Sequence, residues 1–180
     1  EETYASSLLL NDAEKKSTIG YINLPKFYID FTDKNGRKCA DDVRNEIKKL
    51  THEGAEGIII DLRNNGGGSL PEVVRMAGLF IDKGPIVQVK TREGNPVVLD
   101  DKDYRVQYDG PLVVMTNYSS ASASEIFAAA IQDYGRGVII GSPSTFGKGT
   151  VQRVLNLDDY IPKSLDDIKT LIRDDLDLRQ

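Results

Sequence analysis

The stretch GIIIDLRNNGGGS, residues 57–69, decides the fold. It opens with a short continuous run of apolar and β-branched residues, which is typical of a strand buried on both faces. The triple glycine then breaks the strand, and Ser69 with Glu72 has the capping-box spacing of a helix start. A buried strand that leads directly into a helix favours an α/β layered domain over a helix bundle or a β-sandwich.

The alternation of strand and helix patterns continues on both sides of this stretch. Short apolar runs bounded by glycine, proline or polar residues predict strands, and apolar residues at helical spacing predict helices. We expect one domain over residues 1–180, with strands at 18–24, 57–63, 85–91, 95–99, 104–108, 110–117, 137–141 and 149–157. Helices are expected from about 39, 69, 122 and 163, and the first two bury Ala40, Val43, Ile47 and Leu50, then Val73, Val74, Ala77 and Phe80.

The composition is that of an ordinary globular protein: 180 residues, 39% hydrophobic and 28% charged. The net charge of -5 argues against a nucleic-acid surface. The single cysteine, Cys39, leaves no internal disulfide and no cysteine-based metal site. No apolar run reaches transmembrane length, and the opening EETYASS is not a signal peptide but looks like a cut inside a longer protein.

The segment NYSSASASEIFAAAIQDYGRG, residues 117–137, places four serines at the start of an apolar helix. One interpretation is helix capping, because Ser122 and Glu125 have the S-x-x-E spacing. The other interpretation is a nucleophile, because a helix N-terminus offers unpaired N–H groups and a partial positive potential. The N–H of Ala123 could then stabilise the oxyanion that forms when Ser122 attacks a carbonyl. Both interpretations remain open from these residues alone.

A nucleophilic serine needs a base, and two residues are candidates. His52 is the only histidine, but it precedes a buried strand and so lies away from the carboxyl ends where reactive crevices form. Lys148, in STFGKGTVQ, serves only if burial lowers its pKa from about 10.4 toward about 7–8, for which Phe146 could help close a pocket. An extended chain would place Gln152 on the same side as Lys148. The alternatives are an exposed loop lysine and a surface glutamine.

The triple glycine has more than one interpretation. Its amides, those of Gly66, Gly67 and Gly68, can turn inward where side chains would obstruct, and so bind an anion. The alternatives are a tight turn that needs positive φ, or a phosphate loop. No lysine follows the glycines as in a Walker motif, which disfavours the phosphate loop.

Three motifs, DLRNNGGG, SSASASEIFAAAIQDYGRG and TFGKGTVQ, follow one another in an order and spacing that resemble the carboxyl-terminal processing proteases. The bacterial tail-specific proteases are the most similar branch. This resemblance implies a serine endopeptidase with a Ser/Lys dyad on a layered α/β fold similar to crotonase and Clp protease. It also implies protein or peptide substrates recognised by apolar C-terminal ends, and a location in the bacterial periplasm or cell envelope.

Carried over by position, the resemblance makes Ser122 the nucleophile and Lys148 the general base, with Gln152 orienting the lysine. The oxyanion hole would combine the N–H of Ala123 with one from Gly66, Gly67 or Gly68. Asp133, eleven residues after Ser122 and on the same helix face, would give structural support, by fixing the helix or the GRG turn. The family's reaction requires no metal and no organic cofactor.

The chain departs from the family pattern in three places. The loop GSPSTFGK is one residue longer than the usual form, no PDZ segment is present, and the strands that normally follow GTVQ are missing. We therefore expect an excised protease core that holds the dyad and is inactive alone if the missing parts complete the pocket. A non-catalytic module that binds peptides or apolar ligands is the alternative function. An acyl-CoA enzyme of crotonase type is suggested only by fold analogy.

Overall fold

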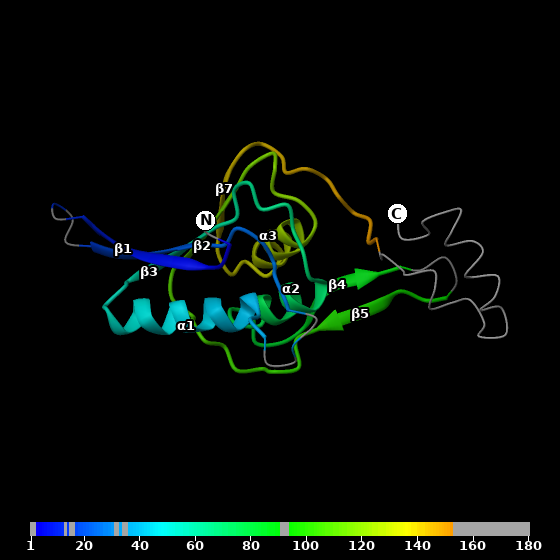
Figure 1. Cartoon of the computed structure of the whole chain (residues 1–180), viewed down its shortest axis with the longest axis horizontal. Helices are drawn as coiled ribbons and strands as arrows, with labels where there is room; N and C mark the ends of the chain where they lie inside the picture. The colour runs from blue at the N-terminus through cyan, green and yellow to red at the C-terminus, as the bar shows by residue number, and fades with distance from the viewer. Residues whose placement is uncertain are drawn as a thin grey trace, which may run out of the picture. The chain divides into compact units, whose positions relative to one another are not determined.

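A computed structural model describes residues 3–12, 14, 17–30, 33, 36–90 and 94–152 (Figure 1). The chain divides into two units, Glu1–Gly149 and Thr150–Gln180. All helices and strands named below belong to the first unit. Of the second unit, Thr150, Val151 and Gln152 are described, and they have no regular secondary structure.

A five-stranded sheet forms the centre of the first unit, in the order β1-β2-β3-β6-β7. β1 is antiparallel to β2, and the other neighbours are parallel. The strands are β1 (Ser6–Asp12), β2 (Ser17–Asn23), β3 (Gly57–Asp61), β6 (Leu112–Thr116) and β7 (Val138–Gly141). A separate two-stranded antiparallel hairpin joins β4 (Pro85–Val89) to β5 (Val97–Asp100). The mixed α/β class expected from the sequence is confirmed at this level.

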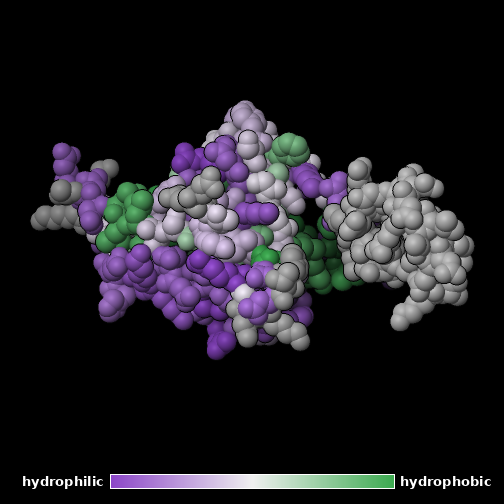
Figure 2. Space-filling model, viewed as in Figure 1, coloured by the Kyte–Doolittle hydropathy of each residue, from purple (hydrophilic) through white to green (hydrophobic). Residues whose placement is uncertain are grey.

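In the part of the chain that the structure describes, three helices connect the strands: α1 (Cys39–His52), α2 (Leu70–Ala77) and α3 (Ala123–Asp133). The predicted apolar stripe of α1 is confirmed, because Ala40, Val43, Ile47 and Leu50 are all fully buried. The outer side of α1 is hydrophilic, as Figure 2 shows below the sheet. Helix α2 ends at Ala77, so Phe80 is buried beyond the end of the helix.

The parallel register aligns side chains that form the core. Ile22, Ile60 and Val114 are neighbours across β2, β3 and β6, and all three are fully buried. Side chains that alternate with them point to the opposite face of the sheet. That face is partly open along the outer strands, where Leu8 is 48% and Val138 60% exposed. The helices therefore pack on one face of the sheet, and the carboxyl ends of β3 and β6 lead into α2 and α3.

Aromatic packing fastens α3 to the rest of the core. The Phe127 ring is fully buried and contacts Phe27 and Phe80, with centroid distances of 6.4 and 5.8 Å. This arrangement ties the helix of the serine segment to the segment that follows β2 and to the one that follows α2. The position of α3 is therefore set by buried apolar contacts rather than by helix propensity.

Replacing Phe127 by alanine is expected to lower the free energy of unfolding by about 3–5 kcal/mol, because it removes a fully buried ring and leaves a cavity. Urea denaturation followed by circular dichroism measures the change. The matched control is Val138→Ala on the exposed edge strand, which should change stability by less than about 0.5 kcal/mol. Equal effects of the two changes would contradict this account of the core.

Several sequence expectations are corrected. Strand β1 was not predicted, because its alternating, partly exposed residues give no buried run. The expected strand at 104–108 is wrong: the N–H groups of Gln107 and Tyr108 both donate to the Leu79 carbonyl instead of to a ladder. Residues 149–152 form no strand, and the rest of the expected strand and the acidic helix from 163 lie outside the described residues.

Candidate active site

The four serines at the start of α3 have different environments. Ser120 and Ser124 are fully buried, and their hydroxyls donate to the carbonyl oxygens of Leu62 (2.8 Å) and Asn65 (2.9 Å). These two serines therefore hold the segment against the end of β3. Ser119 is exposed and lines no described cavity that contains Lys148. Ser122 is half-buried and lines the cavity described below, so it stays the candidate nucleophile.

Ser122 has an unusual backbone. Its φ of 55° and ψ of -113° lie where L-residues are strained. Such strain persists only where the surroundings fix it, and it is concentrated at functional sites. Here the Ala121 N–H donates to the Asn65 carbonyl (3.0 Å), and the Ser122 N–H donates to the Glu125 carboxylate (2.7 Å). The carboxylate half of the predicted capping box is thus present, and it orients the residue before the helix.

The glycine loop, residues 64–68, lies directly against Ser122. A Cβ atom on Gly67 would lie 2.8 Å from Ser122 Cβ and 3.0 Å from the Ala123 nitrogen, and φ of Gly67 is 101°. Only glycine therefore keeps open the space beside the first N–H of α3, which has no acceptor within the helix. A substrate oxygen in this space would meet the Ala123 N–H.

The backbone N–H groups of the three glycines differ in whether they are available to a second ligand atom, such as the oxyanion expected from the sequence. The Gly67 N–H donates to Asn65 Oδ1 (2.9 Å) and is therefore occupied. Gly66 and Gly68 N–H groups donate to no acceptor within the described part of the chain. A Cβ atom on Gly68 would collide with the Phe27 carbonyl, whereas one on Gly66 would meet nothing within 4 Å. Gly66 and Gly68 remain the candidate donors.

Asn65 organises this corner, and sequence reasoning missed it. The residue is fully buried, and its side-chain amide donates to the Leu24 carbonyl (2.8 Å). Its side-chain oxygen accepts from Gly67, and its own carbonyl accepts from Ala121 and Ser124. One residue thus links the end of β2, the glycine loop and the serine segment. The only sequence signal was an asparagine between a buried strand and a glycine run.

Lys148 is carried by a loop after β7, residues 142–149, which we call the lysine loop. The Phe146 N–H donates to the Ser120 carbonyl (3.0 Å), and the Gly147 and Lys148 N–H groups donate to Glu125. Burial raises the pKa of the Glu125 carboxyl, but hydrogen bonds from Thr145 and these N–H groups outweigh it and hold the pKa below its ordinary value. Glu125 is therefore a charged acceptor at neutral pH.

Ser122 and Lys148 line one cavity of about 440 Å³. Its other lining residues come from β4, α3 and the lysine loop: Ile86, Val87, Glu125, Ile126, Ala129, Ala130, Asp133, Gly147 and Gly149. A second hollow of about 700 Å³ lies between the start of α2 and residues 99–105, and it contains neither catalytic candidate. The smaller cavity combines apolar walls with a hydroxyl and an amine, which is the arrangement expected of a site that binds a peptide.

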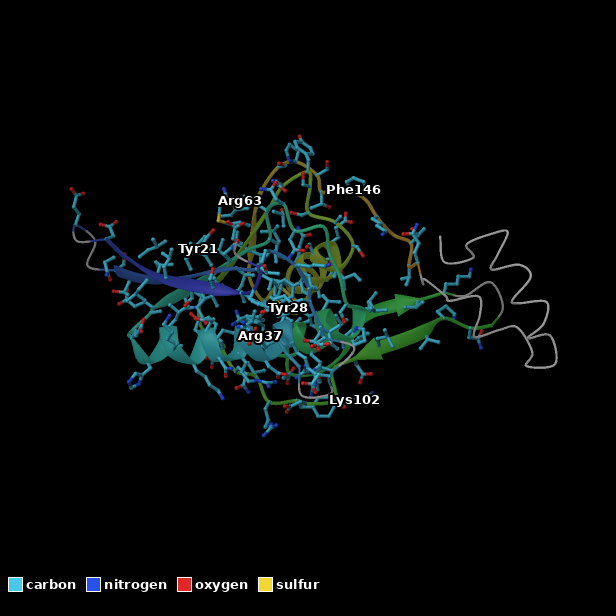
Figure 3. All side chains as sticks on the ribbon, viewed as in Figure 1. Tyr21, Tyr28, Arg37, Arg63, Lys102 and Phe146 are labelled. Atoms are coloured by element: carbon cyan, nitrogen blue, oxygen red, sulfur yellow. The ribbon has the colours of Figure 1, made fainter. Side chains whose placement is uncertain are left out.

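The expected shelter for the lysine is not formed by the described residues. Lys148 is exposed, and Phe146 is 67% exposed and stands on the outer side of its loop (Figure 3). The expectation that Phe146 closes the pocket is therefore wrong for the first unit. Apolar contact on one side of the cavity comes instead from Ile86, Val87 and Ile126.

The remaining predicted site residues are dispersed. Asp133 is the last residue of α3 and lines the cavity, on the helix face expected from its spacing to Ser122. Gln152 is exposed and belongs to the second unit, so its orienting role stays a prediction. His52 is exposed at the C-terminal end of α1 and lines no cavity with Ser122, in agreement with its dismissal as the base.

An ion pair stabilises the start of the glycine loop. Arg63 binds the Asp61 carboxylate with Nε and Nη2, at 3.0 and 2.7 Å, and the Tyr21 hydroxyl donates to the same group (2.5 Å; Figure 3). Burial alone would raise the pKa of Asp61, but these hydrogen bonds lower it by a larger amount. The pKa of Asp61 therefore lies below its usual value. Asp61 is 3% exposed, and a buried charge of this kind is retained only with such partners.

The residues that the structure describes contain no group of three or more His, Cys, Asp or Glu side chains placed to hold a metal ion. Their helices are all too short or too polar to cross a membrane.

Comparisons with known proteins identify the family of the chain. Residues 18–172 match the model of peptidase family S41. The tail-specific protease of Haemophilus influenzae is 48% identical over 157 residues, which cover 87% of this chain and 21% of that protein. The chloroplastic C-terminal processing peptidase of Tetradesmus obliquus is 35% identical over 144 residues, covering 80% of this chain and 29% of the relative.

A solved structure is similar over the same region. The photosystem II D1 C-terminal processing protease matches with a TM-score of 0.67 at 30% identity, covering 86% of this chain and 40% of that one. The mixed α/β arrangement is therefore shared with a processing protease. The present chain spans only 21% and 29% of the length of the two curated relatives.

Proposed function

The chain belongs to peptidase family S41, and from this membership we propose that it carries the Ser122/Lys148 dyad of a serine endopeptidase. The observation that supports the assignment most is that Ser122 and Lys148 line the same cavity. The positive φ of Ser122 before the helix α3 is consistent with it. The layering similar to crotonase and Clp protease, which the resemblance implied, belongs to this proposal.

In the proposed reaction, neutral Lys148 takes the proton of the Ser122 hydroxyl while the serine oxygen attacks a peptide carbonyl. The oxyanion occupies the space that Gly67 leaves open, where the Ala123 N–H and the N–H of Gly66 or Gly68 stabilise it. The lysine then gives its proton to the leaving amine. Water hydrolyses the acyl-enzyme by the same route, with Gln152 orienting the amine.

Lys148 is exposed in the first unit. An apolar substrate side chain seated against Ile86, Val87 and Ile126 would exclude water from one side of the lysine. Substrate binding would thus help to enclose the amine beside the nucleophile.

The proposed substrates are proteins or peptides with apolar C-terminal ends. The apolar walls of the cavity support this choice, as do the names of the two curated relatives. A bacterial envelope location, the periplasm in particular, is proposed on the similarity to the Haemophilus influenzae protein. Asp133, at the end of the cavity wall on α3, is proposed to support the site.

A fluorophosphonate probe applied to the complete gene product tests the proposal against the non-catalytic alternative. Peptide mapping is expected to find one adduct, on Ser122, together with cleavage of an unfolded protein that has an apolar tail. A protein that binds the same substrate without an adduct and without cleavage is a binding module, and the proposal then fails.

A further inference from the structure

The carboxylate of Glu125 connects the two halves of the site. Its Oε1 accepts hydrogen bonds from the Thr145 hydroxyl (2.7 Å) and the Gly147 N–H (2.6 Å). Its Oε2 accepts from the Ser122 N–H (2.7 Å) and the Lys148 N–H (2.8 Å). Four donors, one from the nucleophile and three from the lysine loop, therefore converge on one charged group.

We propose that Glu125 is a positioning residue, whose carboxylate holds the lysine loop against the nucleophile so that the amine of Lys148 stays within reach of the Ser122 hydroxyl. The inference rests on the proposed function, because it gives Lys148 the role of base. It goes beyond helix capping, which concerns only the Ser122 N–H. Glu125 lies 23 residues before Lys148, so this connection is tertiary rather than local.

Within the described part of the chain, two further backbone hydrogen bonds attach the lysine loop. The Ser142 N–H donates to the Thr116 carbonyl (3.4 Å), and the Phe146 N–H donates to the Ser120 carbonyl (3.0 Å). Beyond Phe146, the backbone passes through Gly147 at a φ of 89°, a conformation that glycine adopts without strain but does not enforce. The bonds from Gly147 and Lys148 to the carboxylate therefore hold the direction of the chain at the lysine.

A second glutamate in the chain, Glu72, has the same spacing to a serine and serves as an internal comparison. Ser69 and Glu72 have the same S-x-x-E spacing at the start of α2, and the Ser69 hydroxyl accepts from the Glu72 N–H (3.3 Å). The Glu72 carboxylate instead binds the Ala40 N–H (3.0 Å) and Arg75 (2.7 Å), which packs α2 against α1. Capping spacing therefore does not by itself direct a glutamate to the lysine loop.

The number of donors around Glu125 means that even the isosteric change to glutamine disrupts its hydrogen bonds. Both carboxylate oxygens accept from two donors each, and the ionised group has no proton of its own to offer. In Glu125→Gln, one oxygen becomes an NH₂ group, although the shape of the side chain is unchanged. At the position of Oε2 this group opposes the N–H groups of Ser122 and Lys148, and two bonds are lost. At the position of Oε1 it opposes the Gly147 N–H, while the Thr145 hydroxyl can turn and accept from it, so one bond is lost.

The test measures kcat and KM of the complete gene product with a C-terminally apolar peptide, together with thermal unfolding. Glu125→Gln is expected to reduce kcat by about 10–10²-fold, because misplacement by about 1 Å has effects of that size, while KM changes much less. Thr145→Val, which removes one of the four donors, should reduce kcat less, and Thr145→Ser should restore it. The matched control, Glu72→Gln, should lower the melting temperature but leave kcat per folded molecule unchanged.

Each outcome is decisive. Wild-type kcat in Glu125→Gln, with Ser122→Ala inactive, overturns the positioning role and leaves the proposed function intact. If Glu125→Gln does not fold, Thr145→Val decides, and a kcat equal to that of Thr145→Ser overturns the inference. Turnover retained in Ser122→Ala defeats the proposed function itself, and the inference fails with it.

Discussion

Replacing Lys148 by alanine is expected to reduce kcat of the complete gene product by about 10³-fold, the size of effect that general acid–base catalysis supplies. The reason is that the amine is the proposed base, and the only histidine, His52, lies at the end of α1 and does not line the cavity of Ser122. KM should change little, because the apolar cavity walls are untouched. Steady-state kinetics with a peptide substrate measures both constants.

Lys148→Arg is the matched control for this change. An arginine keeps the length and the positive charge, but its guanidinium is not deprotonated in proteins. It is therefore expected to be as inactive as alanine. An arginine variant with substantial activity would mean that position 148 acts through its charge, for example by binding the substrate, and not as a base.

The second large effect is expected from Gly67→Ala. A Cβ atom there would lie 2.7 Å from the Ala121 carbonyl, 2.8 Å from Ser122 Cβ and 3.0 Å from the Ala123 nitrogen. It would occupy the space proposed for the oxyanion, so kcat should fall by about 10²–10³-fold. The φ of 101° also strains an alanine by roughly 1–3 kcal/mol. Kinetics and urea denaturation of the same preparation separate the two effects.

The neighbouring glycine gives the comparison. A Cβ atom on Gly66 meets nothing within 4 Å, and the alanine keeps the backbone N–H. Gly66→Ala should therefore lose far less activity than Gly67→Ala. If both variants are equally impaired at equal stability, the loop responds to any loss of glycine, and the oxyanion space has been assigned to the wrong side of it.

The elements that depend on local pattern could be predicted from the sequence. The strand at 57–61 and the apolar stripe of α1 are confirmed, because a short apolar run and helical spacing are properties of neighbouring residues. Burial on both faces of this strand is confirmed only in part, since Ile58 and Ile60 are fully buried and Ile59 is half-buried. Strand β1 was not predicted because it is an outer strand in which Leu8 and Leu10 are half-exposed. The strand expected at 104–108 is absent, because alternation of apolar and polar residues does not show which acceptors its N–H groups bind.

The site was predictable in its residue types but not in its connections. Ser122 and Lys148 were identified from motifs, and their shared cavity agrees with that pairing. The reach of Glu125 to the lysine loop and of Asn65 to Leu24 spans 23 and 41 residues, which no local spacing encodes. The exposure of Phe146 was also beyond the sequence, because shelter depends on which surfaces meet after folding.

The most direct test of the dyad is the rate at which a fluorophosphonate acylates Ser122 at neutral pH, measured in the wild type and in Lys148→Ala. The account predicts a much lower rate in Lys148→Ala, because that variant lacks the base that takes the proton of the serine hydroxyl. Identical rates in the two proteins would contradict the role of Lys148 as the base.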